Sequence, residues 1–121
     1  MYNLFIDDER DSRCLQDTKT WETVRSYNEF VDKITKDGPP GFISFDHDLD
    51  DAHYPKEPGE ALREIDYNHP KYKVKSGYHC ALWLIEYCKK MNVPLPKWQV
   101  HSMHMTGRYN ITKVMREASK I

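Results

Sequence analysis

The chain has 121 residues, with 18 lysines and arginines against 19 aspartates and glutamates, giving a formal net charge of −1. This length predicts one domain spanning residues 1–121 with a single core, and the balanced charge argues against a long nucleic-acid-binding surface. Apolar runs such as residues 81–85 are too short to cross a bilayer, and Asp7 and Asp8 interrupt any signal peptide. We therefore expect a cytoplasmic protein with no membrane partner.

The first residues predict a short strand followed by an irregular stretch. Residues 1–6 form an apolar run that ends in acids, which is typical of a buried strand with a charged carboxyl end. Residues 11–20 are polar and lack helical periodicity, so at most one turn is expected there. Residues 21–25 offer a short β-prone segment. Ser26 and Glu29 then form a capping-box pattern that starts an amphipathic helix.

A second buried strand is predicted over residues 42–48, and a long polar segment follows it. Residues 50–75 are rich in Pro, His and Tyr, with a helical turn expected around residues 60–65. A loop of this length in so small a domain is usually functional, so the segment is a lid candidate. Ser76 can then cap a helix that has a wide apolar face.

The last predicted elements are a strand over residues 98–103 and an amphipathic C-terminal helix that Thr106 or Asn110 could cap. Strands and helices therefore alternate, which predicts a small parallel α/β sheet flanked by helices. In such a fold the crossover connections bring every strand's carboxyl end to one edge of the sheet. Open α/β sheets bind their ligands at that edge.

Charged side chains gather at the carboxyl ends of three predicted strands. They are Asp7, Asp8, Asp46, His47, Asp48, His101 and His104. So many titratable groups cannot all ionise without strongly perturbed pKa values. A divalent cation could compensate the acids: carboxylates suit Mg²⁺ or Mn²⁺, whereas imidazoles shift the preference toward manganese, iron or zinc. Alternatively, a protonated His47 or His101 could serve as a general acid beside the carboxylates.

Other polar residues have simpler interpretations. Asp7 or Asp8 alone could cap the following turn. The isolated histidines His53, His69 and His79 are predicted to lie on the surface. The three cysteines, Cys14, Cys80 and Cys88, match no zinc or redox spacing and are expected to be reduced.

A second polar group follows the last predicted strand and precedes a helix N-terminus. It contains Ser102, Gly107, Arg108 and Asn110. Backbone amides at a helix start, a guanidinium and a hydroxyl would together form a cradle for an anion. Acids and histidines on one side and this cradle on the other suggest phosphoester chemistry.

Four motifs occur in a familiar order. They are LFIDDER at 4–10, ISFDHDL at 43–49, SGYHCALWLIE at 76–86 and WQVHSMHMTGRYNI at 98–111. Together they resemble the cyclic-phosphate-processing receiver-like family, over nearly the whole chain outside residues 50–75. The resemblance implies a small flavodoxin-like, receiver-like three-layer sandwich with a reduced, mainly parallel sheet of about four strands.

The resemblance also implies roles for individual residues. The acidic pair of a receiver falls on Asp7 and Asp8, and its acceptor aspartate falls on Asp46. The expected catalytic residues are Asp46, His47, Asp48 and His101. The expected substrate-binding residues are Ser102, His104, Arg108, Arg10 and Asn110, and the expected ligands of a possible Mg²⁺ or Mn²⁺ are Asp7, Asp8 and Asp46. The chain departs from the family pattern at His79, His104 and Met105 and in its longer 50–75 segment, on the substrate side.

The expected function is a phosphoesterase that opens a cyclic phosphate on a nucleotide or an RNA-end-like substrate. One alternative is a module that binds and sequesters a nucleotide through Arg108 and the tyrosines at 54, 67, 72 and 78. Another is a degenerate receiver that binds proteins. A signalling receiver is disfavoured because the last strand ends in histidines and a serine where a receiver carries a lysine. A haloacid-dehalogenase-like phosphatase shares the spacing of Asp46 and Asp48 but needs more chain.

Overall fold

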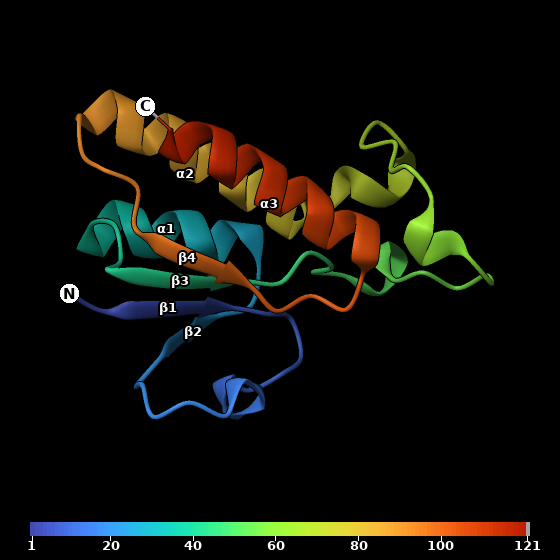
Figure 1. Ribbon diagram of the computed structural model, residues 1–121, viewed down its shortest axis with the longest axis horizontal. Coiled ribbons are helices and arrows are strands. Elements are labelled where there is room, and N and C mark those ends of the chain that lie inside the picture. Colours follow the sequence, from blue (N-terminus) through green and yellow to red (C-terminus); the bar gives the residue numbers. More distant parts are fainter. Residues whose placement is uncertain (121) are drawn as a thin grey trace.

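The computed structural model describes residues 1–120 and contains one four-stranded parallel sheet in the order β2-β1-β3-β4 (Figure 1). The strands are β1 (Asn3–Ile6), β2 (Glu22–Val24), β3 (Phe42–Phe45) and β4 (Lys97–Val100). Ile6 pairs with both Val24 and Phe45, and Phe45 pairs with Val100. The carboxyl ends of all four strands therefore lie at one edge, as predicted.

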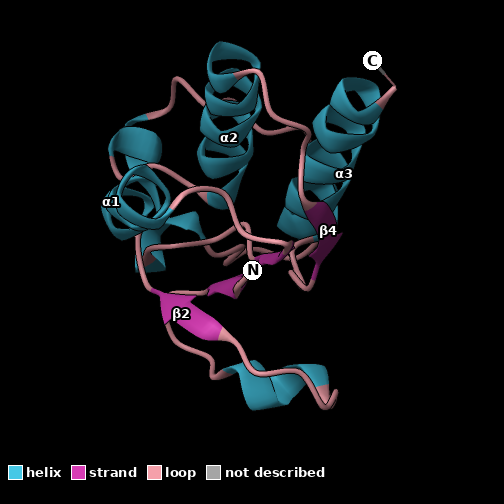
Figure 2. Cartoon of the chain, turned by 90° about the vertical axis from the view of Figure 1, so that its left-hand side faces the viewer, coloured by secondary structure: helices cyan, strands magenta, loops and turns pink. Residues whose placement is uncertain are grey.

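Three helices cover one face of this sheet. They are α1 (Tyr27–Asp37), α2 (Gly77–Met91) and α3 (Met105–Ser119). Figure 2 shows them together on one side, while the 3-10 turn η1 (Ser12–Leu15) lies on the other. The connection between β1 and β2 has only this one turn, as predicted. The α/β receiver-like fold is thus confirmed, with a turn and its flanking loops where a third layer of helices was expected.

The two faces of the sheet are buried by different kinds of side chain. Toward the helices, alternate strand residues such as Leu4 and Ile43 are fully buried in an aliphatic and aromatic core. On the opposite face, the ring of Trp21 contacts Phe5 and Phe42 edge-on, with ring centroids 6.4 and 5.6 Å apart. Aromatic burial on this face partly replaces the absent helix layer.

The helix starts follow the predicted signals at two of three positions. Ser26 caps α1, because its Oγ accepts a hydrogen bond from the Glu29 N–H at 3.1 Å. Ser76 precedes α2, and its N–H donates to His79 Nδ1 at 3.0 Å. The prediction that Thr106 or Asn110 caps α3 is wrong, since the helix already begins at Met105.

Segment 50–75 forms three short 3-10 turns at the carboxyl ends of the strands, in green and yellow in Figure 1. They are η2 (Asp51–His53), η3 (Glu60–Leu62) and η4 (Pro70–Lys73). The buried His53 joins the two ends of the segment: its Nδ1 accepts from the Leu49 N–H at 2.9 Å, and its Nε2 donates to the Val74 carbonyl at 2.6 Å. The prediction of a surface position for His53 is therefore wrong.

All three cysteines are free; Cys14 is exposed, and Cys80 and Cys88 pack in the core from α2. Within residues 1–120, no helix combines the length and the apolar character that crossing a membrane requires.

Candidate active site

The predicted acids and histidines meet at the carboxyl edge of the sheet. Asp7 follows β1, residues 46–48 follow β3, and His101 follows β4. Asp7 and His47 are fully buried, and Asp46 and Asp48 are each only 3% exposed. Carboxylates this deeply buried need compensating partners. They find them in two hydrogen-bonded groups, one around Asp7 and one around Asp48.

In the first group, Asp7 uses both oxygens of its carboxylate. Oδ1 accepts from the N–H groups of Glu9 and Arg10 at 2.9 and 2.8 Å. Oδ2 accepts from Arg10 Nε at 2.9 Å and from His101 Nε2 at 3.0 Å. Burial alone would raise the pKa of Asp7, but these hydrogen bonds outweigh burial and lower it. Asp7 is therefore a stable anion beside Arg10.

The same group fixes the tautomer of His101. The ionised Asp7 carboxylate can only accept from Nε2, so in the neutral ring Nδ1 accepts from Ser44 Oγ at 2.8 Å, and Ser44 Oγ accepts from Gln99 Nε2 at 3.1 Å. His101 Nε2 consequently carries the ring proton that Asp7 accepts. Burial lowers the pKa of His101 even though the bond to Asp7 opposes that shift. His101 is thus a neutral imidazole with both nitrogens bonded, and its ring stacks on Phe5 at a centroid distance of 4.5 Å.

Among the three buried carboxyl groups of the site, Asp46 accepts the fewest hydrogen bonds. Its Oδ1 accepts from the His47 N–H at 2.9 Å and lies 3.5 Å from Arg10 Nη2. Burial, and next the negative charge of Asp7, raise the pKa of Asp46 to about 8. Asp46 therefore titrates near neutral pH.

Asp8 lies outside both groups of the site: its carboxylate accepts from the Tyr54 hydroxyl at 2.7 Å.

In the second group, Asp48 accepts from two imidazoles. His47 Nδ1 lies 2.6 Å and His104 Nδ1 2.9 Å from Asp48 Oδ1. Burial opposes the charge on Asp48, but the hydrogen bonds of His104 and His47 hold its pKa below the usual value. The other nitrogen of His47 accepts from the Tyr67 hydroxyl at 2.9 Å, which in turn accepts from Asn110 Nδ2 at 3.0 Å. His47, like His101, has both nitrogens occupied.

Two glycines let helices start against this cluster. A Cβ on Gly77 would lie 1.7 Å from the backbone oxygen of Asp46, and the Gly77 N–H donates to the His47 carbonyl at 2.7 Å. A Cβ on Gly107 would lie 2.3 Å from His47 Cγ. Only glycine allows α2 and α3 to approach residues 46 and 47 so closely.

A pocket of about 340 Å³ opens beside these groups. Its lining includes Arg10, Asp46, Asp48, Ser102 and His104, and Tyr54 of segment 50–75. We call this pocket the acidic cleft. Its lining combines a guanidinium, which binds anions, with a buried carboxyl group whose pKa is raised to about 8.

The anion cradle predicted from Ser102, Gly107, Arg108 and Asn110 does not form, because these residues do not line one pocket. Because α3 begins at Met105, the Arg108 N–H is already bonded within the helix, to the His104 carbonyl at 2.8 Å. The Arg108 side chain is exposed, and Asn110 binds Tyr67. Ser102 Oγ accepts from the His104 N–H at 3.1 Å. Of the predicted binding residues, Arg10, Ser102 and His104 line the cleft, whereas Arg108 and Asn110 do not.

Three residues outside the predicted catalytic, substrate-binding and metal-binding sets each bond a predicted site residue. Tyr54 and Tyr67 were expected only as nucleotide-binding tyrosines of the alternative module, and no pattern indicated Ser44. His79 was expected on the surface, but it is half-buried, and burial lowers its pKa to about 4.

Two groups of side chains could hold a metal ion: Asp7, Asp46 and His101, and His47, Asp48 and His104. The ligand atoms of a bound Zn²⁺ or Mg²⁺ lie about 3 Å or more apart. In the second group the 2.6 Å separation of His47 Nδ1 and Asp48 Oδ1 is shorter, so it is a hydrogen bond. The first group, with two carboxylates and an imidazole, is the better metal candidate.

Comparison with protein families gives one match. A family model described as the cyclic-phosphate processing Receiver domain matches residues 2–117. No curated protein and no solved structure matches the chain. The matched range contains both groups of the site and the whole of segment 50–75.

Proposed function

The chain belongs to the cyclic-phosphate processing receiver domain family, and from this we propose that it is a phosphoesterase that opens a cyclic phosphate on a nucleotide or an RNA-end-like substrate. One observation carries the proposal. Asp46, a buried carboxyl with a pKa raised to about 8, lines the same cleft as the cation Arg10. An anion held by the guanidinium would therefore lie beside a carboxyl poised for proton transfer.

Arg10 is the group that would bind the phosphoryl oxygens. Its Nε is anchored on Asp7 at 2.9 Å, while its side chain is 38% exposed toward the cleft. A guanidinium fixed in this way can stabilise charge on a phosphoryl group without reorganising during the reaction. Ser102, which also lines the cleft, would contact the same group.

In its ionised form, whose share grows as the pH approaches 8, Asp46 would take the proton of the attacking water. The water oxygen forms a bond to phosphorus, its proton passes to the Asp46 carboxylate, and one ester bond to phosphorus breaks. The leaving oxygen takes its proton from solvent. A base with a pKa near the working pH is effective in such a transfer.

His47 and His101, expected as the acid and the base, would act with Asp48 and Asp7 as positioned pairs. Each ring has both nitrogens hydrogen-bonded, so it orients its partner carboxylate. Direct proton transfer by either ring would require one of these bonds to open.

A divalent cation fits the group of Asp7, Asp46 and His101, which would hold it if Arg10 moved from Asp7 and the ring proton of His101 left Nε2. When bound, Mg²⁺ or Mn²⁺ would polarise the phosphoryl oxygens and acidify a water molecule. Segment 50–75, which contributes Tyr54 to the lining of the acidic cleft, would serve as a lid over the cleft.

The test is hydrolysis of a substrate panel read by mass spectrometry. The panel contains 2′,3′-cyclic nucleotides, RNA with 3′-terminal cyclic phosphate, ADP-ribose cyclic phosphate and cyclic dinucleotides, each with EDTA or Mn²⁺. Asp46→Asn should lower kcat by about 10²–10⁴-fold on the substrate that is consumed. Asp32→Asn, at an exposed position of α1, is the matched control and should behave as wild type.

Undiminished turnover by Asp46→Asn would remove this mechanism. The alternative is a module that sequesters a nucleotide, and the internally bonded nitrogens of His47 and His101 favour it. In that case every compound returns unchanged while one of them raises the melting temperature.

A further inference from the structure

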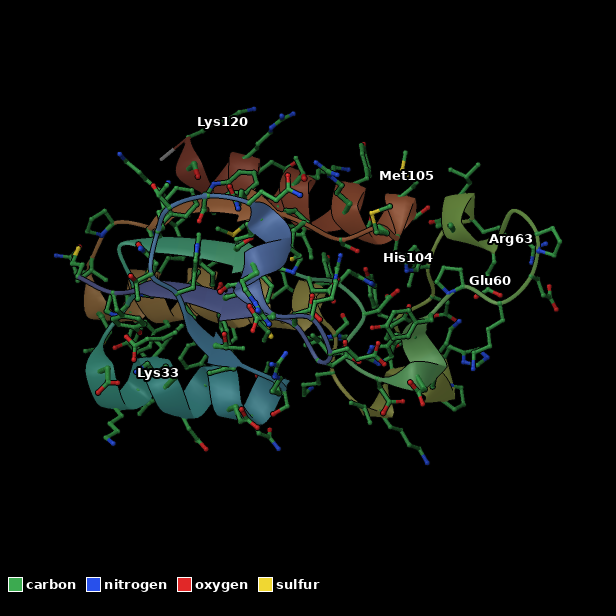
Figure 3. The ribbon with its side chains drawn as sticks, turned by 90° about the horizontal axis from the view of Figure 1, so that it is seen from below. Lys33, Glu60, Arg63, His104, Met105 and Lys120 are labelled. Carbon is green, nitrogen blue, oxygen red and sulfur yellow. The ribbon has the colours of Figure 1, made fainter. Side chains whose placement is uncertain are left out.

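A second pocket lies beside the acidic cleft. It has a volume of about 250 Å³, and its lining includes Glu60, Arg63, Asp66, Lys71, Tyr72 and His104. We call it the 60–72 pocket. Figure 3 shows His104 between the start of α3, marked by Met105, and the loop that carries Glu60 and Arg63. His104 lines both pockets and so forms the boundary between them.

Two buried polar atoms of this lining have no hydrogen-bond partner among the described residues. They are the Tyr72 hydroxyl and His104 Nε2, and no other buried side-chain nitrogen or oxygen in residues 1–120 is in this position. Their residues are only 5% and 6% exposed. Leaving a buried polar atom unpaired costs about 1–3 kcal/mol, so two such atoms in one pocket indicate a missing partner.

The two atoms have opposite hydrogen-bonding character. In the neutral His104 ring, Nδ1 carries the proton that Asp48 accepts, and Nε2 is then an acceptor. Nδ1 faces Asp48, so Nε2 faces away from Asp48. Burial raises the pKa of Tyr72, so its hydroxyl stays protonated and can donate. The ring of Tyr72 is held in place by stacking on His53 at a centroid distance of 4.9 Å. Residues that line the pocket therefore carry one unpaired donor and one unpaired acceptor, and because both atoms are buried, a small shift of these side chains must accompany a bond to a ligand.

We propose that the 60–72 pocket binds the nucleobase of the substrate whose cyclic phosphate occupies the acidic cleft, an inference that rests on the proposed function. The Watson–Crick edge of every nucleobase carries adjacent donor and acceptor groups, which Tyr72 and His104 would pair. The volume lies below that of pockets for drug-sized ligands, so it suits a single ring system. His104, at the boundary, places the base next to the phosphate.

The test measures binding by calorimetry in the full-length Asp46→Asn variant, which is expected not to consume substrate. The probes are the four 2′,3′-cyclic nucleoside monophosphates and methyl riboside 2′,3′-cyclic phosphate, which lacks a base. Tyr72→Phe removes only the hydroxyl. His104→Asn keeps a donor to Asp48 but removes Nε2. Tyr87→Phe, far along α2, is the matched control.

At least one nucleotide should bind about tenfold or more tightly than the base-free probe. Tyr72→Phe and His104→Asn should each reduce this advantage by up to about tenfold, the value of a hydrogen bond. Tyr87→Phe should bind like its parent. If His104→Asn does not fold, Tyr72→Phe decides alone.

Equal affinity for probes with and without a base, or unchanged nucleotide affinity in folded Tyr72→Phe, would overturn the inference. Equal affinity with and without a base would mean that the nucleobase does not enter the 60–72 pocket. The two proposals can fail separately. Hydrolysis that ignores the base removes only the nucleobase site, whereas base-dependent binding without any hydrolysis removes only the phosphoesterase.

Discussion

At the scale of single residues, Asp46 and Asp7 respond to burial in opposite ways although they share one edge of the sheet. Asp7 accepts four hydrogen bonds and stays ionised. Asp46 accepts one short bond and retains its proton up to a pH of about 8. The difference explains why Asp7 anchors Arg10, and it fits the role in proton transfer that we propose for Asp46.

This difference predicts a pH-dependent effect of Asp46→Asn on stability. The pKa of Asp46 rises from 3.8 when unfolded to about 8 when folded, so between these values only the unfolded chain releases the proton. Stability of the wild type therefore falls as the pH rises through this window, and Asn removes the loss. We expect Asp46→Asn to unfold at a higher temperature, with an advantage on the order of 1–3 kcal/mol at pH 8 and none near pH 4.

Calorimetric melting of both proteins from pH 4 to 8 measures this effect, with Asp32→Asn as the control. Asp7 is present in all three proteins, so its own titration cancels in the comparison. A difference between Asp46→Asn and wild type that stays constant with pH would contradict the assignment of the raised pKa to Asp46.

The sequence predicts which acids meet, because parallel strands must bring Asp7, Asp46 and His101 to one edge. It does not predict which of them bond. Asp8 follows Asp7 directly yet binds Tyr54, 46 residues away, and His47 is oriented by Tyr67. These partners depend on how segment 50–75 folds back over the strands, and no local pattern encodes that path.

At the scale of elements, the first turns of α2 and α3 pack against residues 46 and 47. Gly77 of α2 contacts the backbone of Asp46, and Gly107 of α3 contacts the ring of His47. Substituting the contact glycines should therefore have graded effects. Gly77→Ala sets a Cβ against a backbone oxygen, which cannot move without distorting β3, so we expect the protein to unfold or to lose more than about 3 kcal/mol. Gly107→Ala meets the His47 side chain, and a loss of about 1–3 kcal/mol is expected.

Urea denaturation of both variants, with the exposed Lys113→Ala as the control on α3, gives the order. Because Gly107→Ala displaces His47 from Asp48, it should also lower turnover in the native protein. A Gly107→Ala protein as stable as wild type, or Gly77→Ala more stable than Gly107→Ala, would show that these contacts do not limit the helix positions.

Helix and strand ends were predicted less well than the elements themselves. The last strand was expected to run to residue 103 but ends at Val100, because the chain turns where Ser102 Oγ accepts the His104 N–H. After that turn α3 begins at Met105, which is earlier in the chain than the predicted caps Thr106 and Asn110. Arg108 and Asn110 are thereby placed inside the helix, where their backbone amides cannot bind an anion.

At the scale of the whole molecule, the sheet has one face covered by helices and one covered by a loop with a few aromatic rings. Trp21 is the central ring of the second face, in contact with Phe5 and Phe42. Phe5 in turn stacks on His101 of the site. The cover of this face therefore contacts the site through Phe5 and His101, which belongs to the group around Asp7.

Trp21→Ala should destabilise the protein by about 1–3 kcal/mol, less than for a fully buried tryptophan because the ring is partly exposed. Trp21→Phe retains an aromatic edge and should lose less. Urea denaturation gives both values. Turnover in the absence of urea should also fall for Trp21→Ala, because without the indole ring Phe5 no longer holds His101 in place by stacking. If Trp21→Ala and Trp21→Phe were equally stable, aromatic packing at position 21 would not contribute to covering this face of the sheet.

The placement of the three cysteines gives the molecule internal reporters of partial opening. Burial raises the pKa of Cys80, which lies in the core between α2 and the sheet, whereas Cys14 is exposed on the loop side. A thiol reagent would therefore modify Cys14 in the native protein and Cys80 only after α2 leaves the sheet. The ratio of the two labelling rates would give the free energy of detaching the helix layer, and its change with a bound nucleotide would show how strongly the ligand holds that layer in place.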